Sequence, residues 1–213
     1  MKELLKCFAL IGMLLAPVVQ ADPQWDAASK VVEKVTADMV TLIEQGVDVN
    51  DDASFQASMA TIEQTVEGVI DFGYIAQRVM GKYYRRASDE ERARFAEVFR
   101  QTMVKTYTKA LAGFEITRVE LVAPTVESPE PDKQVVTLDV YSGNGTKYTL
   151  VNYMLERDGQ WQLVNVIVDG INLRLTFTNQ FADMAERSNG NVTVAIDSWQ
   201  SQIETRALRS EDA

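Results

Sequence analysis

The sequence predicts a single α+β domain in which several helices precede an antiparallel sheet. Before Gly113 the apolar residues recur at spacings of three and four, which is typical of amphipathic helices. After Gly113 they alternate with polar residues, and this period of two is typical of strands. Helices and strands that are segregated along a chain in this way form α+β domains.

The start of the chain has the features of a secretory signal peptide. Lys2 and Lys6 form a basic start, residues 7–15 form an apolar run, and Ala21 is a small residue at the expected cleavage position. The only cysteine, Cys7, opens the apolar run, whereas a lipidated cysteine would follow it. We therefore expect a leader at residues 1–21, one domain at 22–205 and a frayed tail at 206–213.

Composition narrows the classes of function. The formal net charge is −10 at pH 7, which disfavours nucleic acid as a partner and opposes adsorption to an anionic membrane surface. No segment approaches the roughly 20 apolar residues of a membrane-spanning helix, so no stable membrane insertion is expected. Because the chain has no histidine and no glycine-rich phosphate loop or carboxylate calcium loop, we expect no metal site and no cofactor.

Four helices are expected in the first half of the domain: one at residues 29–44, one that follows Asp52 and reaches Val69, one between Asp71 and Gly81, and one between Ser88 and Gly113. Gly46 ends the first, and Asp71 caps the third. Ser88 and Glu91 form a capping box, because the hydroxyl accepts from the backbone N–H of Glu91 while the carboxylate accepts from that of Ser88. The fourth helix then presents a long, partly aromatic apolar face.

Four strands are expected next, at residues 116–123, 134–142, 147–157 and 161–168. A proline-rich loop at 124–132 separates the first two, and turn residues separate the others, which predicts an antiparallel meander. Beyond the strands, residues 171–184 are ambiguous between strand and helix. A last helix follows Gly190.

The last hairpin has a register that can be predicted residue by residue. A two-residue turn at Asp158 and Gly159 sets Arg157 opposite Gln160. One face then pairs Tyr153 with Val164, Val151 with Val166 and Thr149 with Val168, and the other pairs Met154 with Leu163, Asn152 with Asn165 and Leu150 with Ile167. Both faces are largely apolar, so this part of the sheet needs cover on each side.

Two groups of polar residues invite a functional interpretation. Asp139 shares a strand face with Tyr141, which leaves open an acid/base site of a carboxylate and a phenol in an apolar cavity, although a solvated aspartate is the simpler interpretation. The second group is basic, in an acidic chain, and consists of Arg78, Lys82, Arg85 and Arg86. It is either a solvated helix face or a rim that meets a phosphate headgroup or an acidic partner.

One stretch of the sequence resembles a known family. The stretch runs from Asp71-Phe72-Gly73-Tyr74-Ile75-Ala76 through Val79-Met80-Gly81-Lys82-Tyr83-Tyr84-Arg85-Arg86-Ala87-Ser88 to Glu91 and Arg92. It resembles the signature of MlaC, the toluene-tolerance family of periplasmic phospholipid carriers. Downstream landmarks agree at Tyr153, Gly159, Trp161, Val166, Val168, Gly170, Leu173, Gln180 and Phe181, whereas Val164, Asn165, Asn172, Phe177 and Thr178 depart from the family pattern.

The resemblance implies a fold, a function and partners. The fold is a curved antiparallel sheet with helices around a deep apolar pocket, related to nuclear transport factor 2. The function is to shuttle phospholipid in the periplasm between an outer-membrane lipoprotein–porin complex and the lipid-binding component of an inner-membrane ABC transporter, which maintains outer-membrane lipid asymmetry. Such a carrier is not an enzyme and has no catalytic residue.

A carrier of this kind must enclose its cargo. A two-chain phospholipid has on the order of 30 methylenes, and exposing them to water would cost about 24 kcal/mol at about 0.8 kcal/mol each. We chose the sheet face whose predicted pairs are apolar without interruption. The candidates for the lining are Phe72, Ile75, Val79, Phe99, Met103, Tyr107, Tyr141, Val151, Tyr153, Val164, Val166 and Val168.

Three alternatives remain open at the level of the sequence. A relative of the family could carry hopanoids or other isoprenoid lipids. A small-molecule enzyme could use the same fold. A non-lipid interaction or chaperone module would also fit a chain without histidine.

Overall fold

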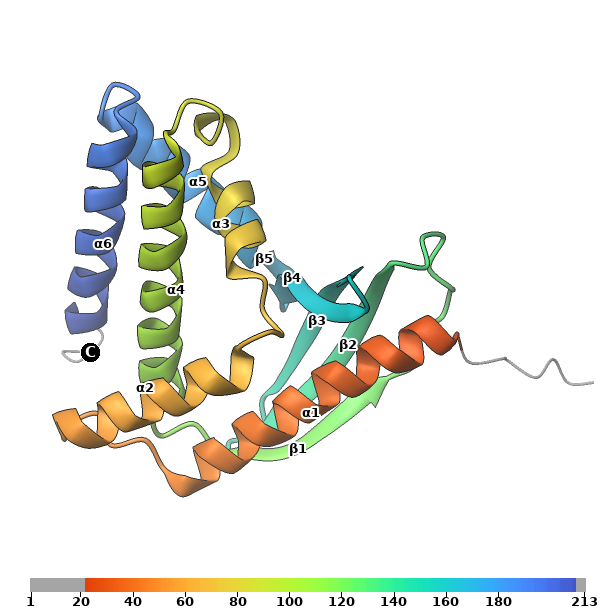
Figure 1. The fold of residues 1–213 in the computed structure, drawn as a ribbon. Coiled ribbons are helices and arrows are strands. Elements are labelled where there is room, and N and C mark those ends of the chain that lie inside the picture. The colour runs from red at the N-terminus through yellow and green to blue at the C-terminus, as the bar shows by residue number, and fades with distance from the viewer. Residues whose placement is uncertain (1–21, 210–213) are drawn as a thin grey trace, which may run out of the picture.

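The computed structural model describes residues 22–209, with side chains described as far as Ser201. The elements are α1 (Pro23–Gln45), α2 (Asp52–Val66), α3 (Phe72–Met80), the 3-10 helix η1 (Gly81–Tyr83), α4 (Asp89–Leu111), β1 (Ile116–Val122), β2 (Lys133–Ser142), β3 (Lys147–Arg157), β4 (Gln160–Val168), β5 (Ile171–Asn172), α5 (Leu173–Arg187) and α6 (Val192–Arg209) (Figure 1). The predicted α+β fold is confirmed. The expected leader lies outside the described residues, as do residues 210–213 of the expected tail.

The helices begin where side chains can satisfy free backbone N–H groups. The capping box predicted at Ser88 is confirmed, with Ser88 Oγ 3.1 Å from the backbone nitrogen of Glu91 and Glu91 Oε2 2.8 Å from that of Ser88. Helix α1 begins at Pro23, earlier than expected, because Asp22 accepts from the backbone of Gln24 and proline suits the first helical position. Within residues 22–209, no helix combines the length and the apolar character needed to cross a membrane.

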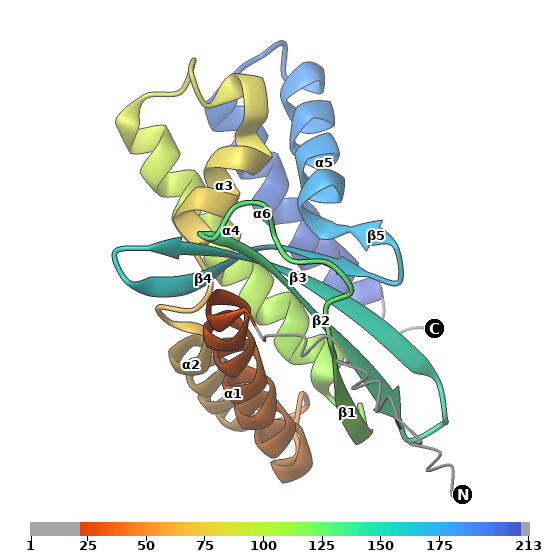
Figure 2. The ribbon, with the colours of Figure 1, turned by 90° about the vertical axis from the view of Figure 1, so that its right-hand side faces the viewer.

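The sheet is an open antiparallel meander in the order β1-β2-β3-β4-β5. Arg157 pairs with Gln160, as the two-residue turn predicts. Asp158 and Gly159 have φ values of 52° and 78°, the positive angles that the mirror-image hairpin turns require. Figure 2 shows α1 and α2 below the strands and α3 and α5 above them.

The predicted register is wrong beyond the pair Met154–Leu163. A bulge at Val164 shifts the pairing, so that Tyr153 lies opposite Asn165 instead of Val164. Beside the bulge, Leu163 also bridges Ile70 on its other edge, and its N–H donates to the carbonyl of Val69. The extra residue of a bulge locally bends the strand and reverses the alternation that follows.

This bulge moves two predicted partners to the other side of the sheet. Val166 now pairs with Asn152 and Val168 with Leu150, on the side that α1 covers. We call this side the covered face; its members include Val119, Leu121, Val136, Leu138, Leu150, Met154, Trp161 and Leu163. We call the opposite side the outer face; its members include Arg118, Glu120, Thr137, Asp139, Tyr141, Lys147, Thr149, Val151 and Tyr153.

The outer face is more polar than expected. Lys147 and Thr149 contact Asp139, with Lys147 Nζ 2.9 Å and Thr149 Oγ1 2.7 Å from its carboxylate. The Tyr141 hydroxyl lies 3.1 Å from the carboxylate of Glu120. These contacts satisfy polar groups in partial contact with solvent, so over β1 to β3 this face needs no covering layer.

The hydrophobic core is divided into separate clusters. Helices α3 to α6 share one cluster, centred on the rings of Phe95, Phe99, Phe181 and Trp199. Helix α1 and the covered face share a second, and α1, α2 and α4 share a small third cluster. The buried core is thus not one contiguous cluster, as it is in most domains, although α3 and α5 also pack against β4.

Glu91 provides a pH-dependent test of this packing. Its carboxylate accepts from the backbone N–H of Ser88 and from the hydroxyl of Thr193 on α6, and these bonds lower the pKa of Glu91. A lowered folded-state pKa stabilises the protein above the ordinary glutamate range and loses this effect as pH falls through the folded value. We expect urea unfolding to give a lower free energy of unfolding for Glu91→Ala at pH 7, with the difference shrinking below about pH 4. The control is Glu90→Ala, in the same turn without these bonds; a difference that persists unchanged at pH 3 would contradict the assignment.

Candidate functional site

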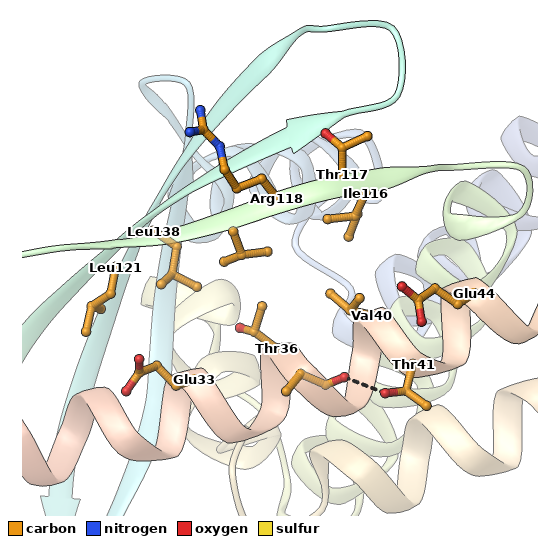
Figure 3. A pocket seen from close by; sticks show the side chains of 12 residues that line it. Glu33, Thr36, Val40, Thr41, Glu44, Ile116, Thr117, Arg118, Leu121 and Leu138 are labelled. Atoms are coloured by element: carbon orange, nitrogen blue, oxygen red, sulfur yellow. Dashed lines mark hydrogen bonds between the residues drawn. The ribbon is translucent and has the colours of Figure 1, made fainter.

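An open cleft lies between α1 and the strands β1 and β2 (Figure 3). Its volume is about 590 Å³. The lining residues are Glu33, Thr36, Ala37, Val40, Thr41 and Glu44 on α1, Ile116, Thr117, Arg118, Val119 and Leu121 on β1, and Leu138 on β2. Since it enters between a helix and the apolar face of the sheet, it is the candidate binding site of this fold. A second hollow of about 680 Å³ lies on the surface beside the loop at residues 123–129.

The cleft exists because one stripe of α1 carries short side chains. The α1 residues that line it follow spacings of three and four, so they share one helix face. The four in the middle of that stripe are Thr36, Ala37, Val40 and Thr41. Near its start, by contrast, α1 packs Trp25, Ala28 and Val32 tightly against the sheet. Helix α1 therefore closes one end of the covered face and leaves the β1 end open.

The inner surface of the cleft is apolar. Val119, Leu121 and Leu138 supply aliphatic side chains from the covered face. The threonine hydroxyls on α1 donate to their own helix, with Thr36 Oγ1 2.8 Å from the carbonyl of Val32 and Thr41 Oγ1 2.9 Å from that of Ala37. Because these hydroxyls already donate within the helix, the wall does not require a polar group of the ligand as a hydrogen-bond partner.

The charged groups lie at the margins of the cleft. The side chain of Arg118 points away from α1 in Figure 3 and pairs with Glu120 at 2.9 Å. Glu33 and Glu44 are exposed, and their carboxylates point from α1 toward the strands. Sequence analysis did not identify Glu33 and Glu44 as site residues. The α1 stripe between them has the pattern of an ordinary solvated helix face, and only the position of β1 opposite it makes it a cleft wall.

The predicted lining residues on helices fall mainly within the helix bundle. Val79, Phe99 and Met103 are buried in its core cluster, and Phe72 and Ile75 are half-buried at its edge. The structure thus brings these five together, but none of them lines the cleft beside α1.

Tyr107 differs from the other helical candidates. It is 40% exposed, yet burial raises the pKa of its phenol. Tyr107 does not line the cleft beside α1. Two turns further along the chain, Phe114 contacts Tyr148 of β3 with ring centroids 5.8 Å apart, and this contact brings the end of α4 to the sheet.

The predicted lining residues on strands are divided between the two faces. Tyr141, Val151 and Tyr153 lie on the outer face, with Tyr153 37% exposed. Val166 and Val168 lie on the covered face, and Val164 is buried at the bulge. The prediction that all six share one face is wrong, because it assumed an uninterrupted hairpin.

The predicted basic rim does not frame the cleft. Arg78, Lys82, Arg85 and Arg86 are exposed on α3, η1 and the turn that follows. This connection between α3 and α4 lies at the top of the molecule in Figure 1, whereas α1 and β1 lie at the bottom. Lys82 pairs with Glu186 at 3.3 Å, and this hydrogen bond raises the pKa of the lysine. The rim is a separate surface of the bundle.

The acid/base alternative finds no support in the geometry. Hydrogen bonds from Thr149 and Lys147 lower the pKa of Asp139, whereas a general base needs a pKa near the working pH. Asp139 also lies on the polar outer face rather than in an apolar cavity. Among the side chains that the structure describes, residues 22–201, no three carboxylate, histidine or cysteine groups are placed to hold a metal ion.

Known proteins resemble this chain in sequence and in fold. The family model described as "MlaC protein" matches residues 33–201. The toluene tolerance protein ttg2D of Pseudomonas putida is 32% identical over 137 residues, which is 63% of this chain and 62% of that protein, so the match spans less than two thirds of the relative. A phospholipid-binding protein from Ralstonia solanacearum, solved in complex with a phospholipid, has a TM-score of 0.68 at 20% identity, covering 85% of this chain and 98% of that one. At this identity the likeness shows the fold alone.

Proposed function

Because the chain belongs to the MlaC family, we propose that it binds phospholipid and transports it between membranes. The observation that carries this proposal is the apolar cleft between α1 and the covered face, at a place where the core does not close. Its volume of about 590 Å³ falls within the roughly 300–1,000 Å³ of small-molecule sites. The phospholipid that the Ralstonia relative was solved with has the chemistry that such a cleft suits.

The cleft supports a role in holding acyl chains rather than in catalysis. Enclosing about 30 methylenes avoids about 24 kcal/mol of exposure to water, and the apolar wall of the cleft comes from α1 and the covered face. We propose that chains enter along Val119 and Leu121 and continue over the covered face. Of the candidates predicted from sequence, Val166 and Val168 share the covered face, and we propose that they extend this path.

The finer role follows from the family and from the predicted leader. We propose that the protein works in the periplasm, where it exchanges lipid with an outer-membrane lipoprotein–porin complex and an inner-membrane ABC transporter and so helps maintain outer-membrane lipid asymmetry. The basic rim is then a docking surface. It lies far from the cleft (Figure 1), so a partner can contact the bundle while lipid moves at the sheet.

The first test is the lipid content of the protein. Purified without detergent and extracted with organic solvent, the folded chain is expected to yield about one diacyl phospholipid per protein by mass spectrometry. Hopanoids in the extract would favour the isoprenoid alternative. Empty extracts from well-folded protein would count against the carrier.

The second test asks which sheet face holds the lipid. Leu121→Asp puts a carboxylate into the cleft, and desolvating a charge against acyl chains is costly, so bound lipid should fall several-fold. The matched control is Val135→Asp, an equivalent change at a 42% exposed strand position of the outer face. Circular dichroism checks that both variants fold. Loss of lipid in Val135→Asp alone would instead favour the outer face.

The third test concerns the basic rim. Replacing Arg85 and Arg86 by alanine should slow lipid transfer to vesicles that contain the inner-membrane transporter, most clearly at low ionic strength, while bound lipid stays unchanged. Lys30→Ala with Lys34→Ala, on exposed positions of α1, removes the same charge elsewhere. Equal transfer rates for the arginine variant and the native chain would show that Arg85 and Arg86 are ordinary solvated surface residues and not a docking site.

A further inference from the structure

The charged side chains that line the cleft differ in how free they are to contact a ligand. Arg118 is already engaged, because its guanidinium pairs with Glu120 at 2.9 Å and lies 3.9 Å from the ring centroid of Tyr141. It also points away from α1 (Figure 3). Glu33 and Glu44 point into the space between α1 and the strands. Among the described residues, no lysine or arginine lies within ion-pair distance of either carboxylate.

The two carboxylates mark the two ends of the cleft. They are eleven positions apart on one helix, which corresponds to about 16 Å at 1.5 Å per residue. Between them the wall is made of methyl and methylene groups, as described above. An apolar chain can therefore occupy the middle of the cleft while a polar headgroup at either end meets a carboxylate.

Resting on the proposed function, we infer that this cleft selects phospholipids by headgroup charge and favours those that carry an amine. An ammonium group, as in phosphatidylethanolamine, is attracted to an unpaired carboxylate, and its phosphate can stay in solvent. A headgroup with negative charge alone, as in phosphatidylglycerol, meets two like charges, and Arg118, the one cation among the described lining residues, is already paired with Glu120. Such a repulsive element is a common source of specificity.

The Glu44 end is the stronger of the two. Glu44 lies in the last turn of α1, which contains no basic residue. The unpaired carbonyl groups at a helix C-terminus carry partial negative charge, which adds to that of the carboxylate. Because both glutamates are exposed, solvent screens them, and each should change the preference by only about two- to fivefold.

The experiment measures headgroup preference directly. The delipidated chain is incubated with an equimolar mixture of phosphatidylethanolamine and phosphatidylglycerol in detergent, the detergent is removed, and the bound lipids are counted by mass spectrometry. We expect the native chain to prefer phosphatidylethanolamine. Glu44→Gln should lower the ratio about two- to fivefold, Glu33→Gln by less, and the double variant by the most. Raising the ionic strength should weaken the native preference.

The control keeps the net charge matched. Glu67→Gln with Glu90→Gln removes two exposed carboxylates that do not line the cleft, and it should leave the lipid ratio unchanged. Equal binding of both lipids by the native chain would overturn the inference, as would a preference that Glu33→Gln and Glu44→Gln leave intact; either result leaves the carrier function standing. Failure of the folded native chain to bind any lipid would instead refute the proposed function.

Discussion

The packing of α1 on one face of the sheet is the contact on which the rest of the structure depends. Trp25, Ala28 and Val32 bury the part of that face formed by Val136 and Met154, and the indole N–H of Trp25 bonds the carbonyl of Val135 at 3.0 Å. Further along, the same helix presents short side chains to the cleft opposite β1. Because a helix is a straight rod with a fixed set of faces, tight packing at one end and short residues at the other create a cleft.

Polar contacts around Asp71 and Tyr74 join the helix bundle to the sheet. Asp71 caps α3 by accepting from Tyr74 at 2.8 Å and also pairs with Arg157 of β3 at 2.7 Å. Tyr74 in turn lies against two guanidinium groups, with Arg78 at 4.8 Å and Arg157 at 4.6 Å from its ring centroid. These residues open the stretch that carries the family resemblance. Its first role is therefore structural, since it anchors α3 to the sheet.

The distribution of charge is consistent with two surfaces of different use. The basic side chains of the rim lie on the helix bundle, while the cleft presents Glu33 and Glu44. The chain has a net charge of −10, yet the basic side chains of the rim are clustered and repel one another. Such a local excess of positive charge indicates a surface that could attract an acidic partner. A carrier that meets protein at one end and lipid at the other can load and unload without the two contacts competing for one surface.

Local features of this fold could be predicted from the sequence by itself, and non-local ones could not. The capping box at Ser88 and the turn at Asp158 and Gly159 were predictable because each depends on neighbouring residues. The bulge at Val164 escaped prediction because neither the turn residues nor the apolar alternation of the hairpin marks where an extra residue is inserted. Most of the predicted lining residues are the apolar positions of helices and strands, and periodicity identifies such positions without saying which neighbour fills the space beside them. Only the tertiary structure decides that the open space lies next to α1. A cleft forms where the side chains of two segments, distant in the sequence, leave a gap between them, and the sequence does not say which segments face each other.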